Sequence, residues 1–229
     1  MQNQQPSTLK EIRVHGTQNF PCAFYQTGTR IKGNIVKHHW HEEVELLYFS
    51  GGEFCLEVNM ERFHISEECF YFINPGELHS INVEKNGGCV ENAVVFHMDM
   101  LNSSYSLDQI QTNLIQPVQN GSIQFPRCLR KDEPAFEQVR TAYEEIQNAF
   151  SGSAYRGDYY DGEAVTDDIT RQLFIKSALL RILAVLSANN LFEVTEKNHD
   201  RWIETIKTTL TYIQENYKEK IYIRDLAGL

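Results

Sequence analysis

The sequence predicts an α+β protein, with a mainly β N-terminal half that forms an antiparallel barrel or sandwich and a helical part after it. Two observations support this fold class. Short apolar or alternating runs separated by turn residues fill the chain from about Phe20 to Met98, and beyond about Leu101 apolar residues recur every three or four positions. We therefore expect a barrel in residues 1–100, a helical linker and dimerisation region in residues 101–217, and a separate short segment in residues 218–229.

The β half contains five runs with the length and spacing of strands. Glycine, asparagine or proline follows most of them, as expected for an antiparallel barrel or sandwich. Asn86-Gly87 is a cue for a hairpin, because both central positions of a type I′ turn need a positive φ. The five runs are VELLYFS (44–50), FCLEV (54–58), CFYFI (69–73), LHSINVE (78–84) and CVENAVVFHM (89–98).

Three amphipathic helices are expected after the barrel. Their apolar positions begin at Phe136, Ile175 and Ile203 and repeat at helical spacing. Pro134 suits the first turn of the first helix. The polar segments 151–162 and 187–200 are predicted to be connections, because glycine, asparagine and aspartate interrupt the helical pattern there.

Composition narrows the class of protein. Hydrophobic residues make up 41% of the chain, with no apolar run long enough to span a bilayer, and the start has no pattern of a secretion signal. We expect a cytoplasmic protein with no membrane partner. The five cysteines are scattered and lack a C-x-x-C pair, which predicts reduced thiols. A formal net charge of -10 disfavours nucleic-acid binding by this segment.

A cluster of histidine and glutamate precedes the first of the five strand runs. If one strand ran unbroken from Lys37 to Phe49, then His39, His41 and Glu45 would share a face, because side chains alternate along a strand. His79 follows the Pro75-Gly76 turn on another strand and is a fourth candidate. The other face of this strand is apolar, which predicts that helices or a second subunit cover the outside of the barrel.

Three interpretations of this cluster remain open at this point. Imidazole and carboxylate groups form a ligand set for a divalent ion such as Zn, Ni, Fe(II) or Mn. The same groups could instead bind an effector directly, or satisfy one another through hydrogen bonds. In the last case His38, Glu42 and Glu43 would be solvated charges at the rim.

The spacing of these residues resembles the cupin superfamily. Gly33, His39, His41, Glu45 and Gly52 reproduce the first motif of that superfamily. The segment from Asn74 to His79, with Asn82, approximates the second motif, although Asn74 replaces a proline and Asn82 comes one residue early. The resemblance implies a cupin-like, jelly-roll barrel whose metal ligands are His39, His41, Glu45 and His79.

The chain as a whole resembles an AraC-type transcriptional regulator. The stretches that carry this resemblance are HWHEEVELLYFSGGEFCLEVN, FINPGELHSI and the closing YIQENYKEKIYIRDLAGL. It implies a barrel that binds a small effector such as a sugar or related metabolite through His41, Glu45 and His79. It also implies a homodimer, no catalytic residues, and DNA binding only through a helix-turn-helix domain that is mostly missing here and begins in residues 218–229.

Two further expectations follow. The helix that carries Ile175, Leu179, Ile182 and Leu186 is apolar around more than one face, which predicts that these residues form an intersubunit seam. The alternative function is a metal-dependent cupin enzyme, a dioxygenase or isomerase, that uses the four ligand residues as its catalytic centre.

Overall fold

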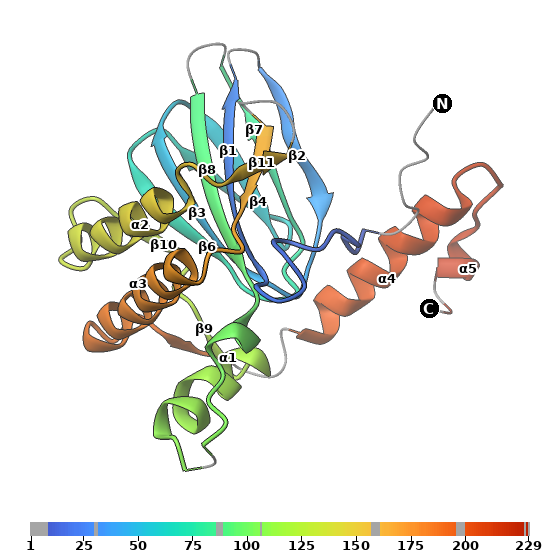
Figure 1. Ribbon diagram of the computed structural model, residues 1–229. Coiled ribbons are helices and arrows are strands. Elements are labelled where there is room, and N and C mark those ends of the chain that lie inside the picture. The colour runs from blue at the N-terminus through green and yellow to red at the C-terminus, as the bar shows by residue number, and fades with distance from the viewer. Residues whose placement is uncertain are drawn as a thin grey trace.

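Two antiparallel β-sheets face each other in this protein, and helices pack outside them (Figure 1). The computed structural model describes residues 9–29, 32–85, 89–105, 107–156, 161–195, 200–226 and 228. The larger sheet has, in spatial order, β10 (Cys128–Arg130), β6 (Cys69–Ile73), β3 (Val44–Gly51), β8 (Cys89–Phe96), β1 (Cys22–Thr29), β12 (Asp161–Val165) and β11 (Ala154–Arg156). The smaller sheet has β2 (Gly33–His39), β7 (His79–Val83), β4 (Phe54–Val58) and β5 (Glu61–Ile65).

Strand alternation divides the apolar residues into two cores. On β3, Leu47 and Phe49 point between the sheets and pack with residues of β4 and β7. Val44 and Leu46 point the other way, into a core shared with the helices. The prediction that helices or a subunit cover the outer face is therefore confirmed, and the cover is helical.

The helices follow the sequence pattern closely. The three long ones are α2 (Phe136–Phe150), α3 (Ile169–Ala188) and α4 (Asp200–Asn216). Asp168 caps α3, because its carboxylate accepts hydrogen bonds from the N–H groups of Thr170 and Arg171 at 2.8 and 3.1 Å. Shorter elements are a 3₁₀ turn (Met98–Leu101), a π-helical turn (Gln111–Ile115), α1 (Gln116–Gln119), α5 (Ile223–Leu226) and a small ribbon of β9 (Ile123–Gln124) and β13 (Glu193–Val194).

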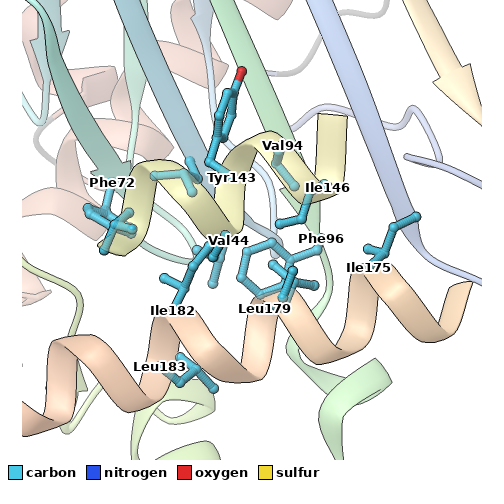
Figure 2. Close-up of a cluster of buried hydrophobic side chains, with 14 of the residues drawn as sticks. Val44, Phe72, Val94, Phe96, Tyr143, Ile146, Ile175, Leu179, Ile182 and Leu183 are labelled. Atoms are coloured by element: carbon cyan, nitrogen blue, oxygen red, sulfur yellow. The ribbon is translucent and has the colours of Figure 1, made fainter. Parts of the chain in front are cut away.

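The predicted intersubunit seam is wrong in its choice of residues. Ile175, Leu179 and Ile182 point toward α2 and the larger sheet (Figure 2), and Leu186 is fully buried with them in the same core. The opposite side of α3 exposes a different apolar set, which consists of Ile169, Leu173, Phe174 and Leu180.

Three other local expectations are corrected. The predicted connection 151–162 contains β11 and the start of β12, which add to the larger sheet beside β1. The strands on either side of Asn86-Gly87 do not pair, since β7 belongs to the smaller sheet and β8 to the larger, so no hairpin forms; residues 86–88 themselves lie outside the described part. The strand from Lys37 to Phe49 is interrupted, because β2 ends at His39 and β3 begins at Val44.

Two predictions from composition can be compared with the structure. The four cysteines that the structure describes in full, Cys22, Cys55, Cys69 and Cys128, are free thiols. Among the described residues, no helix combines the length and apolar character that crossing a bilayer requires.

Candidate effector and metal site

The site lies where the chain passes from the smaller sheet to the larger. His39 is the last residue of β2 and pairs with His79, the first residue of β7. His41 lies in the short link, and Glu45 is the second residue of β3, on the face that points between the sheets. The four predicted residues do come together, but they do so because the chain changes sheets and not because one strand runs through.

The turn of residues 74–77 fixes His79 beside His41. The Gly76 N–H donates a hydrogen bond to the carbonyl oxygen of His41 at 2.7 Å, with Gly76 at a positive φ of +79°. Asn74 departs from the second cupin motif, and its backbone N–H donates to Glu77 Oε2 at 2.7 Å, a bond that proline cannot make.

Each of the three histidines is oriented by its own backbone. The Nδ1 atoms of His39, His41 and His79 lie 2.8, 3.1 and 2.9 Å from the carbonyl oxygens of Lys37, Glu43 and Glu77. These bonds place the ring proton on Nδ1 and leave Nε2 with a free lone pair, which is the arrangement of histidines that bind metals. Ligand atoms of the three histidines all lie within 4.8 Å of one another.

Glu45 and His79 face each other in the buried part of the site. Glu45 Oε2 lies 3.0 Å from His79 Nε2 and 3.6 Å from His41 Nε2. Both Glu45 Oε2 and His79 Nε2 are buried without a hydrogen-bond partner. With the His79 proton on Nδ1, two acceptors face each other, and only a proton or a cation between them makes this contact favourable.

Charges in the site favour a cation. Burial lowers the pKa of His79, so its ring is neutral near pH 7. Burial alone would raise the pKa of Glu45, but the imidazoles of His41 and His79 beside it lower it well below its usual value. A neutral imidazole beside a buried carboxylate is a donor set that fits a divalent ion such as Zn, Ni, Fe or Mn.

Two residues of the N-terminal segment, Glu11 and His15, enter the same site and were not predicted from the sequence. Glu11 Oε2 lies 3.2 Å from His39 Nε2 and 3.4 Å from His15 Nε2. Burial alone would raise the pKa of Glu11, but His15 and His39 lower it below its usual value. A Glu-x-x-x-His pattern outside any strand gave no signal of where these side chains would point.

Two of the residues expected at the rim, Glu42 and His38, are exposed, but each has a charged partner. Glu42 is exposed and pairs with Lys10 at 2.7 Å. His38 is also exposed, although its Nε2 lies 3.0 Å from Glu57 Oε1. A separate group of possible ligands, Cys55, His64 and Glu84, lies outside the barrel, because Cys55 points away from the interior that Phe54 and Leu56 fill.

Comparison with known proteins identifies the family. The family model described as the AraC-like ligand-binding domain matches residues 26–168. The chain belongs to this family. It is also similar to the helix-turn-helix-type transcriptional regulator YdeC of Bacillus subtilis (strain 168), with 25% identity over 96% of this chain and 69% of that protein. The AraC-type resemblance inferred from the sequence is confirmed, and the chain is an effector-binding regulatory domain.

Two solved structures with cupin folds have low overall similarity to this chain. A predicted oxalate decarboxylase from Thermotoga maritima is 25% identical, with a TM-score of 0.31, over 32% of this chain and 64% of that one, so less than two thirds of it is spanned. A cupin protein from Bacteroides fragilis is 12% identical, with a TM-score of 0.32, over 38% of this chain and 75% of that one.

Proposed function

We propose that this AraC-like domain holds a divalent metal ion on His39, His41, Glu45 and His79, and that a small effector binds at or above this point. The observation that carries the proposal is the buried contact between Glu45 Oε2 and His79 Nε2, at 3.0 Å, in which neither atom has a hydrogen-bond partner. A bound ion would supply the positive charge that this contact lacks. His41, Glu45 and His79 are the residues that we assign to the effector as well.

The metal class follows from the donors. Neutral imidazole nitrogens with a carboxylate suit Zn, Ni, Fe(II) or Mn more than the oxygen-binding ions Ca and Mg. An effector with hydroxyl or carboxylate oxygens, such as a sugar or a related metabolite, has the groups that bind to such an ion and to the histidines.

Regulation would work by a shift of populations. An effector that binds one arrangement of barrel and helices more tightly than another favours that arrangement in proportion to its differential affinity. DNA binding would belong to a helix-turn-helix domain, of which residues 218–229 are the first part, and the protein would act in the cytoplasm. The relative from Bacillus subtilis, a transcriptional regulator of the helix-turn-helix type, supports this placement.

We also propose a homodimer that uses the exposed side of α3. Ile169, Leu173 and Phe174 are 72, 63 and 58% exposed on a helix whose other side is fully packed. An apolar face of this kind is costly to leave in water and fits an equivalent face on a second copy.

The alternative, a metal-dependent cupin dioxygenase or isomerase, is less well supported. The family match is to a ligand-binding domain and not to an enzyme. We therefore propose that the four residues sense or bind, and we assign no catalytic residue.

Elemental analysis tests the metal site. Protein purified without an immobilised-metal column should contain near-stoichiometric Zn, Ni, Fe or Mn, and the double variant His41→Ala, His79→Ala should lose it. His97→Ala is the matched control, because His97 lies after β8 and its Nδ1 accepts a hydrogen bond from the Asp99 N–H at 3.2 Å. Wild-type protein that holds no metal, even after incubation with these ions, would overturn the metal site; if the double variant then also loses effector binding, the four residues bind the effector directly.

A further inference from the structure

The N-terminal segment, residues 9–16, is docked across the link between the two sheets. The Trp40 N–H donates to the carbonyl oxygen of Leu9 at 3.0 Å, and the Glu11 N–H donates to the carbonyl oxygen of Trp40 at 2.9 Å. These two bonds attach the segment to the residue between His39 and His41. The segment is therefore registered to the site by backbone geometry, and Glu11 is held at a fixed position relative to the histidines.

The far end of the segment is also fixed. The Gly16 N–H donates to Glu163 Oε1 at 2.9 Å, and Arg13 binds the other oxygen of Glu163 at 3.0 Å. Gly16 has a φ of +82°, and a Cβ at this position would lie 2.5 Å from the carbonyl oxygen of Cys22. Only glycine fits at this position, so His15 lies next to a closely packed backbone segment.

His15 is buried and oriented as a metal-binding histidine would be. The residue is 4% exposed, and its Nε2 atom is buried with no hydrogen-bond partner. Its Nδ1 lies 2.7 Å from the hydroxyl oxygen of Tyr25, which orients the ring. Ligand atoms of Glu11, His15 and His41 lie within 4.8 Å of one another, so His41 belongs both to this group and to the group with His39 and His79.

We infer that Glu11 and His15 are additional ligands of the ion proposed above, so that the N-terminal segment completes the site. This inference rests on the metal site of the proposed function and adds two residues to it. The separations support it: Glu11 Oε2 to His39 Nε2 is 3.2 Å, and Glu45 Oε2 to His79 Nε2 is 3.0 Å. Neighbouring ligands of an octahedral ion with bonds of about 2.1 Å are roughly 3.0 Å apart.

The composition of the completed site selects among metals. The residues offer six donors, four imidazoles from His15, His39, His41 and His79 and two carboxylates from Glu11 and Glu45, and all but Glu45 lie in two groups that share His41. Structural zinc sites are almost always four-coordinate, whereas Mn²⁺, Fe²⁺ and Ni²⁺ accept six nitrogen and oxygen ligands. The site therefore suits one of these three ions.

Segment docking and ion binding are linked, because the same two side chains take part in both. An ion that is bound by Glu11 and His15 stabilises the docked segment, and by reciprocity the docked segment raises the affinity for the ion. Removing either side chain should then weaken ion binding and loosen the segment together.

The test compares Glu11→Gln and His15→Gln with the control Glu61→Gln, which makes the same change of charge as Glu11→Gln at an exposed position of β5. Calorimetric titration of metal-free protein with Mn²⁺ and Ni²⁺ should show affinity reduced at least about 10-fold in the first two variants, the lower end of the range for outer-shell partners of metal ligands, and unchanged in the control. Hydrogen exchange provides a second readout: the Glu11 and Trp40 amides should become more protected when wild-type protein binds the ion, and less so in His15→Gln.

The outcomes separate the two proposals. Wild-type protein that binds neither ion, nor Zn²⁺, would overturn the metal site itself and this inference with it. In a second outcome, wild type, Glu11→Gln and His15→Gln bind the ion equally well and amide protection does not change. This result would be consistent with the four-residue site and would overturn the role of the N-terminal segment. Circular dichroism of each metal-free variant shows whether its fold is intact.

Discussion

The carbonyl oxygen of His41 accepts a hydrogen bond from the N–H of Gly76 at 2.7 Å. This bond joins the link between the sheets to the turn that precedes β7, so the position of His79 depends on the backbone of His41. Two predictions concern this turn, one concerns the base of the N-terminal segment, and one concerns α3.

Gly76→Ala should destabilise the protein by about 1–2 kcal/mol, because an alanine at positive φ is strained. Space is not the cause, since a Cβ would have only the Lys207 ammonium within 4 Å, at 3.5 Å. Urea unfolding followed by circular dichroism measures the change. Gly51→Ala is the control, since Gly51 has no positive φ and nothing lies within 4 Å of its Cβ position. Equal stability of the two variants would contradict the role given to the turn.

Asn74→Pro would bring the turn closer to the second cupin motif, yet it should destabilise this protein by about 2–3 kcal/mol. The substitution removes the N–H bond to Glu77 and the side-chain oxygen that accepts from the Phe125 N–H at 2.8 Å, and buried polar partners are then left unsatisfied. Asn74→Ala separates the two effects, because it keeps the backbone N–H. A proline variant as stable as wild type would show that the Glu77 bond is dispensable.

Glu163→Gln should reduce stability by roughly 1.5–3 kcal/mol at pH 7, the range for hydrogen bonds to a charged group. Burial alone would raise the pKa of Glu163, but the Gly16 N–H, Arg13 and Tyr25 lower it below its usual 4.5. A carboxyl with a lowered pKa contributes stability above its unfolded-state pKa and loses it as the pH falls through its folded-state pKa. The difference between wild type and variant should therefore be full at pH 7 and shrink below about pH 4.5.

This pH dependence can be followed by thermal unfolding at several pH values from 3 to 7. A difference in melting temperature that stays constant over this range would contradict an ionised Glu163 at the base of the N-terminal segment.

The double variant Leu173→Glu, Leu180→Glu should convert the proposed dimer to a folded monomer. Both side chains are exposed on α3, at 63 and 43%, so the charges should cost little in the monomer and much in an apolar interface. Light scattering at tens of micromolar measures the mass. Leu179→Glu is the contrasting variant: Leu179 is buried in the core with α2, so this charge should unfold the protein. A wild-type monomer under these conditions would contradict the dimer.

Local patterns predicted much of this fold. The five strand runs became β3, β4, β6, β7 and β8, and the helical spacing located α2, α3 and α4. The strands appear as short apolar or alternating runs and the helices as apolar residues every three or four positions, and both patterns are visible without knowledge of the neighbours.

The missed elements depend on distant partners. β12 contains an aspartate and a glycine that favour a turn, and it becomes a strand because it pairs with β1, more than a hundred residues earlier in the chain. The face of α3 that packs inward was also not decidable from a helix that is apolar on several sides.

The candidate site was predicted only in part for the same reason. The spacing around His39, His41 and Glu45 identified its centre, although the unbroken strand assumed for it does not exist. Glu11 and His15 are placed at the site by backbone hydrogen bonds with Trp40 and by the hydrogen bond from the Gly16 N–H to Glu163. Neither contact can be predicted from the local sequence.

The change of sheet between His39 and Val44 has a mechanical consequence. Within the described residues, no strand pairing connects the two sheets, and His39 and His79 belong to one sheet while Glu45 belongs to the other. Whatever joins these side chains acts as a cross-link that sets the spacing of the sheets at this end of the molecule. The helices α2 and α3 pack on the outer face of the larger sheet. The Lys207 ammonium of α4 lies 4.5 Å from the ring of Trp40, in the link between the sheets. A small change in the spacing of the sheets would therefore move α4 relative to α2 and α3. Occupancy of the proposed site would in this way be converted into a displacement at the surface of the domain.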